Sequence, residues 1–121
     1  MSEKKSVLRD KSFGFAVDCI ILNQELTESR KEFVISKQFL RSGTSIGANI
    51  REAQNAESKA DFIHKLGIAQ KECDETIYWL ELLNRTGYIN DQEFESISVK
   101  ANELLKMIGS SVLSSKSHSN S

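Results

Sequence analysis

The sequence is poor in several residue types that other classes of protein depend on. Its 121 residues include no proline, two cysteines and only 7% aromatic side chains. This composition is typical of a helical protein and not of a sheet protein or a disordered chain. The cysteines, Cys19 and Cys73, are far apart and form no Cys-x-x-Cys pair. The sequence therefore indicates neither a disulfide framework nor a zinc knuckle, and it favours a reducing cytoplasm.

Strong net charge and long apolar runs are also missing. Sixteen Lys and Arg residues oppose 17 Asp and Glu residues, for a formal net charge of −1, so the chain as a whole is not a polycation. The amino-terminal stretch MSEKKSVLRDK is basic, but Asp18 interrupts the apolar stretch that follows it. That pattern resembles neither a signal peptide nor a membrane span. We therefore expect a cytoplasmic protein of one domain, with no membrane role.

The pattern of apolar residues predicts four helices, over about residues 10–27, 32–55, 59–86 and 91–113. Ser58 followed by Asp61, and Asn90 followed by Glu93, are typical of helix starts, and Gly87 is typical of a helix end. Short connections make each helix antiparallel to the one before it. We predict an all-α, up-down-up-down four-helix bundle over residues 1–113 and a disordered Ser-rich tail over residues 114–121.

Two glycines, Gly43 and Gly47, lie one helical turn apart inside the second predicted helix, in the stretch LRSGTSIGANI. A glycine in a helix interior costs up to about 1 kcal/mol, so some other interaction must offset the pair. Close approach of another helix backbone is our interpretation. A bend or break of the second helix is the alternative.

The first and third predicted helices are apolar on two sides. An isolated bundle needs only one apolar side per helix, so the second side predicts association with copies of the same chain. A monomer with a wide core is the alternative. In the first helix, one apolar side carries Phe13, Ala16, Val17 and Ile20, and the other lies roughly opposite. The side chains that we expect between copies are Phe15, Leu22, Leu26, Ile68, Trp79 and Leu82.

Candidate metal ligands and catalytic groups are sparse. A di-iron bundle needs two Glu-x-x-His units, and the chain has a single Asp61-x-x-His64 on a polar helix side. Glu52, Glu72 and Glu75 form a carboxylate set that is suited in principle to a cation, but ion pairs with arginines of the second helix explain them more simply. We expect no enzymatic activity, no cofactor and no metal, with a carboxylate metal-binding bundle as a remote alternative.

The second helix and the connection before it carry a local excess of positive charge. Residues 30–51 hold five basic side chains and one acidic side chain, a balance of +4. Lys37, Arg41 and Arg51 share the side of this helix that faces away from its core. These three are our candidate contacts to RNA or DNA, by weak and non-specific binding to the phosphate backbone. The alternatives are an ordinary solvated face and an interface with the acidic third helix.

The stretches LRSGTSIGANIREA, at residues 40–53, and DFIHKLGIAQKECDETIYWLELL, at residues 61–83, resemble the bacterial four-helix bundle family of the 23S rRNA intervening-sequence proteins. The match extends from KSFGFAVDCI to LLKMIGSSV. This family is similar to the accessory variability protein of diversity-generating retroelements. That likeness implies a ring-like homopentamer that binds nucleic acid and a reverse transcriptase. Most members of the family have no established activity.

These observations converge on a binding or assembly module. We expect a non-enzymatic, homo-oligomeric four-helix bundle, pentameric as the resemblance implies, with a possible role in weak nucleic-acid binding. The alternative is a scaffold that binds only protein partners.

Overall fold

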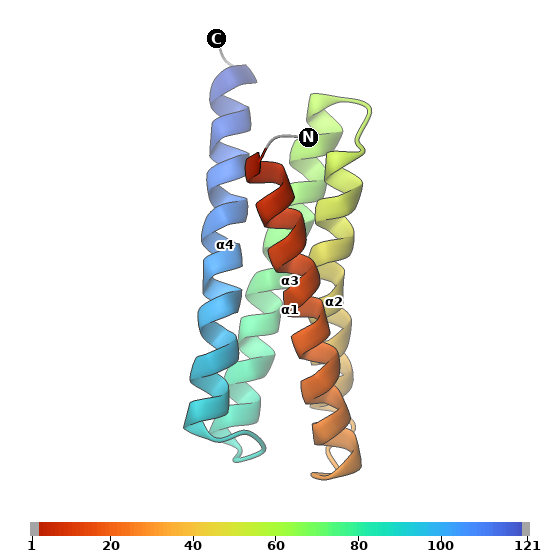
Figure 1. The fold of residues 1–121 in the computed structure, drawn as a ribbon, viewed down its shortest axis with the longest axis vertical. Coiled ribbons are helices and arrows are strands. Elements are labelled where there is room, and N and C mark those ends of the chain that lie inside the picture. The colour runs from red at the N-terminus through yellow and green to blue at the C-terminus, as the bar shows by residue number, and fades with distance from the viewer. Residues whose placement is uncertain (1–2, 120–121) are drawn as a thin grey trace.

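The computed structural model describes residues 3–119, which form four α-helices joined by short loops (Figure 1). The helices are α1 (Glu3–Glu28), α2 (Ile35–Gln54), α3 (Lys59–Arg85) and α4 (Asp91–Ser119). Each helix runs antiparallel to the one before it, and both chain ends lie at the same end of the bundle as the α2–α3 loop (Figure 1). The predicted all-α four-helix bundle is confirmed.

Contacts between the helices are unequal around the bundle. The α1–α2, α2–α3 and α3–α4 interfaces are extensive, whereas α1 and α4 close the bundle with a much smaller contact. One continuous apolar core fills the space between the four helices. Its largest fully buried side chains are those of Phe15, Leu26, Phe39, Ile46, Ile50, Leu66, Leu80, Leu83, Ile89, Leu104 and Ile108.

Two helices are longer than the sequence predicts. α1 begins at Glu3, and Leu8, which precedes the predicted start at residue 10, extends its buried side toward the amino terminus. α4 continues to Ser119, so residues 114–119 are helical where we expected a disordered tail. Residues 120–121 of that predicted tail lie outside the described residues.

The α1–α2 connection is held by a buried carboxylate. Lys31 has a positive φ of 57°, and the chain then turns into α2. The Glu32 carboxylate accepts hydrogen bonds from the backbone N–H groups of Val34, Ile35 and Ser36, at 3.1, 2.9 and 2.6 Å. Burial alone would raise the pKa of Glu32, but these hydrogen bonds outweigh it and hold the pKa below its ordinary value. Glu32 therefore caps α2 as a carboxylate.

The caps predicted for α3 and α4 are present. The Ser58 hydroxyl accepts the N–H of Asp61 at 3.0 Å. Asn90 and Glu93 form a reciprocal pair, in which each side chain accepts the backbone N–H of the other residue. Gly87, with φ of +82°, follows the end of α3. These local interactions fix three of the helix ends that the sequence predicts.

Arg30 joins the two loops at the opposite end of the bundle from the chain termini. Its guanidinium donates two hydrogen bonds to the Glu93 carboxylate, at 3.1 and 2.6 Å, and another to the carbonyl of Tyr88. Hydrogen bonding from Arg30 holds the pKa of Glu93 below its ordinary value. The α1–α2 connection is thereby tied to the start of α4.

Candidate functional site

The outer side of α1 carries a strip of exposed apolar side chains. Phe13 and Ile21 are each 59% exposed, Ile20 is 43% exposed and Val17 is 40% exposed. Spacings of three and four residues place Phe13, Val17 and Ile20 on one side of the helix, with Ile21 next to them. Single exposed apolar residues are common on protein surfaces, but four on adjacent turns of one helix are typical of a binding surface. We call these four residues the α1 strip.

The prediction that Phe15 and Leu26 lie between copies of the chain is wrong. Both side chains belong to the core of the single chain, at 2% and 0% exposed. A helical pattern with two apolar sides does not reveal which side faces the bundle. In α1 that choice follows from close contacts with the glycines of α2, on the side that carries Ser12 and Cys19. The opposite side, which includes Phe13 and Ile20, is left exposed.

The other side chains expected between copies lie at the margin of the core. Leu22 and Trp79 are partly buried and pack against the core, and Ile68 and Leu82 are partly buried on α3. The Trp79 ring meets the exposed ring of Tyr78 edge-on, with centroids 5.0 Å apart. A role of Leu22, Ile68, Trp79 and Leu82 in an interface stays a prediction.

Gly43 and Gly47 lie at close contacts between α1 and α2. A β-carbon added at Gly47 would lie 3.3 Å from the backbone oxygen of Ser12, and one added at Gly43 would lie 2.5 Å from the sulfur of Cys19. α2 is one helix from Ile35 to Gln54, without a break at either glycine. The close contacts explain why glycine is present at both positions.

A hollow of about 420 Å³ lies along the outer surface of the bundle, between the exposed sides of α1 and α2. Phe13 and Ile20 of the α1 strip form part of one wall. The other wall is made of the small residues Thr44, Gly47 and Ala48, with Arg51 and Glu52 at its edge. The α1 strip therefore borders a surface with little side-chain bulk.

The candidate nucleic-acid face of α2 is partly neutralised by α3. Arg41 donates hydrogen bonds to the carboxylates of Glu72 and Glu75, at 3.1 and 3.0 Å. The proposed ion pair between α2 and Glu72 is thus present. Lys37 and Arg51 are exposed, and neither has an ion-pair partner within residues 3–119.

The three glutamates considered for a cation do not form one cluster. Glu52 lies 3.7 Å from Lys65, whereas Glu72 and Glu75 bind Arg41. Across the described part of the chain, no group of three or more His, Cys, Asp or Glu side chains could hold a metal ion. None of the four helices is long and apolar enough, within residues 3–119, to cross a membrane.

The two cysteines are free and fully buried. Burial raises the pKa of both thiols, and that of Cys73 rises to about 12. The Cys73 thiol also donates a hydrogen bond to the carbonyl of Ala101 at 3.2 Å. Because the reactive species is the thiolate, these thiols act as small core side chains and not as nucleophiles.

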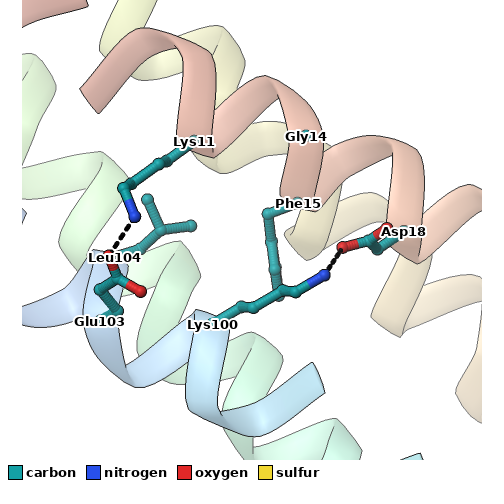
Figure 2. A pocket seen from close by; sticks show the side chains of 7 residues that line it. All are labelled: Lys11, Gly14, Phe15, Asp18, Lys100, Glu103 and Leu104. Atoms are coloured by element: carbon teal, nitrogen blue, oxygen red, sulfur yellow. Dashed lines mark hydrogen bonds and ion pairs between the residues drawn. The ribbon is translucent and has the colours of Figure 1, made fainter. Parts of the chain in front are cut away.

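The seam between α1 and α4 contains a cavity of about 360 Å³, bridged by two ion pairs (Figure 2). Lys11 of α1 binds Glu103 of α4, and Lys100 of α4 binds Asp18 of α1 at 2.7 Å. These four side chains are about one-third to one-half exposed, so each pair contributes little to stability. The remaining lining residues are Gly14, Phe15 and Leu104.

Comparison with known proteins connects this bundle to a family. Residues 4–110 match the model of the 23S rRNA-intervening sequence protein family. The chain belongs to this family. The match confirms the resemblance drawn from residues 40–53 and 61–83, while the relation to the accessory variability protein stays a prediction.

A solved structure supports the same assignment for this 23S rRNA-intervening sequence family member. A crystal structure from Bacteroides thetaiotaomicron, described as a protein of unknown function from the S23 ribosomal protein family, is 56% identical to the chain. The two superpose with a TM-score of 0.89, over 90% of this chain and 97% of the other. No curated protein matches the chain. Its function must therefore be inferred from its own surfaces.

Proposed function

We propose that this member of the 23S rRNA-intervening sequence family is a non-enzymatic module that assembles with copies of itself through the α1 strip. The exposure of Phe13, Val17, Ile20 and Ile21 carries the proposal. α1 already buries a complete apolar side in the core, so helix formation and packing within one chain do not require this second apolar side. Covering it removes apolar surface from water, which favours association.

The surroundings of the α1 strip support a second copy of the chain as the partner. Thr44, Gly47 and Ala48 form a wall of small residues beside the strip. The large side chains of the strip form a ridge, and the wall of small residues forms a groove beside it. A helix of another molecule can pack closely against such a surface, with its own ridge in the groove. A second copy offers a helix of this kind in its own α1. A ring of five copies is the arrangement that the family resemblance implies, and a ring forms through head-to-tail contacts.

Nucleic-acid binding by α2 has less support than assembly through the α1 strip. Of the three candidate contacts, Arg41 already binds Glu72 and Glu75, which leaves Lys37 and Arg51 as the unpaired cations of this face. A scaffold that binds only other proteins is the second alternative, and it would use the same α1 strip. Purification from a nuclease-treated lysate separates these two roles, because a protein partner is retained after the nucleic acid is removed.

One pair of matched substitutions tests the assembly proposal. Val17→Glu introduces a charge into the α1 strip, and Val99→Glu makes the same change at an exposed valine of α4, outside the strip. We expect light scattering to show an oligomer for the wild type and for Val99→Glu, and a smaller species for Val17→Glu. Equal effects of the two substitutions would contradict a role for the strip, provided that circular dichroism shows both variants to be folded.

A further inference from the structure

The charges of the bundle are separated along its long axis. A plane across the middle passes through the Ser12–Gly47 contact of α1 and α2 and close to the Cys73–Ala101 hydrogen bond of α3 and α4, and leaves residues 3–12, 47–71 and 105–119 on the side of the chain termini. This half holds ten Lys and Arg residues and five Asp and Glu residues, a balance of +5. The other half, residues 13–46 and 72–104, holds six Lys and Arg residues and twelve Asp and Glu residues, a balance of −6. The net charge of −1 thus conceals a basic half and an acidic half.

Ion pairing within a half does not change its balance of charge. In the acidic half, Arg30, Arg41 and Lys100 are each bound by a carboxylate, and the carboxylates outnumber the three remaining cations, Lys31, Lys37 and Arg85. In the basic half, most cations have no such partner within residues 3–119. Those without one are Lys4, Arg51, Lys59, Lys71, Lys106 and Lys116. Because their charge is not cancelled locally, the basic half attracts polyanions.

The side chains of the basic half suit a phosphate backbone. A cavity of about 150 Å³ at this end is lined in part by Lys4, Gln54, Ser111 and Ser114. Lysine and serine side chains are common donors to phosphate oxygens, whereas the Gln54 amide already donates to the carbonyl of Lys5 at 2.8 Å, and Leu8, Phe62 and Leu66 are the apolar part of the lining. The basic residues come from all four helices, so the positive charge surrounds this end of the bundle and is not confined to a single closed anion site.

The distribution of apolar residues argues against an anionic membrane as the ligand. A membrane-surface helix combines basic residues with exposed aromatic and aliphatic side chains on the same segment. Here nine of the eleven large apolar side chains that are exposed in the described chain, the α1 strip among them, lie in the acidic half, and only Val7 and Leu113 lie in the basic half. The two surfaces are therefore suited to different partners.

We propose that the basic half binds the phosphate backbone of nucleic acid, without reading the base sequence. The contacts differ from those expected on α2: Lys37 and Arg41 lie in the acidic half, and only Arg51 belongs to the basic half. Binding does not depend on assembly through the α1 strip. In any cyclic ring of copies, however, all the basic halves lie at the same level along the ring axis, so the charges of the copies are brought together.

Two charge-reversal variants of equal net charge test this proposal. The first carries Lys59→Glu and Lys116→Glu in the basic half. The control carries Lys31→Glu and Arg85→Glu, two cations of the acidic half with no ion-pair partner in the described chain and outside the candidate face of α2. Two Lys or Arg to Glu changes take the formal charge from −1 to −5 in both variants, so a difference between them reports position and not net charge.

Fluorescence anisotropy with a DNA duplex of about 20 base pairs and arbitrary sequence measures the outcome. We expect the wild type to bind at low salt, with an affinity that falls by about 0.9 log units per phosphate contact for each log unit of salt. The basic-half variant loses at least about tenfold in affinity, and the control changes by less than about threefold. A second duplex of unrelated sequence binds equally well.

Several results would overturn the proposal. These are no duplex binding by the wild type at low salt, equal loss in both variants, or a larger loss in the control. Binding to anionic vesicles without binding to the duplex would identify a membrane ligand instead. Light scattering on the same samples distinguishes this proposal from the proposal of assembly through the α1 strip. A monomer that binds the duplex would contradict assembly but not nucleic-acid binding. An oligomer that does not bind the duplex would contradict nucleic-acid binding but not assembly.

Discussion

The backbone oxygen of Ser12 lies 3.3 Å from the position that a β-carbon on Gly47 would take. One turn earlier in α2, Gly43 faces the sulfur of Cys19 in the same way. These two contacts set the spacing of α1 and α2. They also determine which apolar side of α1 is buried. The other apolar side, which carries Phe13, is exposed as a result.

Alanine at Gly43 is expected to destabilise the bundle. The new β-carbon would lie 2.5 Å from the Cys19 sulfur and 3.2 Å from its β-carbon, both in a fully packed core. Overpacking of this kind costs about 1–3 kcal/mol. Gly67→Ala is the matched control, because nothing lies within 4 Å of its added β-carbon. The control should gain about 0.5–1 kcal/mol from helix propensity. Urea denaturation measures both, and equal stability of the two variants would contradict the proposed spacing role.

Removing the charge of Glu32 is expected to weaken the start of α2. Glu32→Gln should lower the free energy of unfolding by about 1 kcal/mol at pH 7, a typical value for loss of a helix cap. Glu28→Gln, at an exposed glutamate near the same loop, should change it by less than about 0.5 kcal/mol.

The effect of Glu32 should also depend on pH. Its pKa in the folded protein is below the unfolded value of about 4.3, so its contribution is complete above that value. The contribution is lost as the pH falls through the folded pKa. The difference in stability between wild type and Glu32→Gln should therefore be constant near neutral pH and shrink in acid below about pH 4. A difference that grows in acid would show that the carboxylate is not the capping species.

Both native cysteines should resist thiol reagents. Cys19 and Cys73 are fully buried, and their raised pKa values keep them protonated at pH 8. We expect a disulfide reagent to label neither thiol in the native protein and both in denaturant. Ser110→Cys, at an exposed position of α4, provides a reactive control. If a cysteine of the native protein is labelled as rapidly as that control, the core around Cys19 and Cys73 must open to solvent, which would contradict the prediction.

Much of the fold follows from local signals in the sequence. Ser58 with Asp61 and Asn90 with Glu93 mark the starts of α3 and α4, and Gly87 marks the end of α3, because each interaction involves residues close together in the chain. The early start of α1 was missed, since Leu8 lies among charged residues and its burial depends on other helices.

The surfaces were harder to predict because they depend on distant residues. The +4 balance of residues 30–51 suggested a basic face, but the carboxylates that bind Arg41 come from α3, at Glu72 and Glu75. Likewise, the choice of buried side on α1 depends on glycines of α2. The division into a basic and an acidic half becomes visible only when three separate segments of the sequence are brought to one end.

The claim that the α1 strip joins copies of the chain is tested most directly by the mass of the wild-type protein in solution. Sedimentation equilibrium over micromolar concentrations should give a single multiple of the 13.6 kDa chain, with five copies as the expected number. A 13.6 kDa species throughout that range, with the Phe13 side of α1 open to water, would contradict the account.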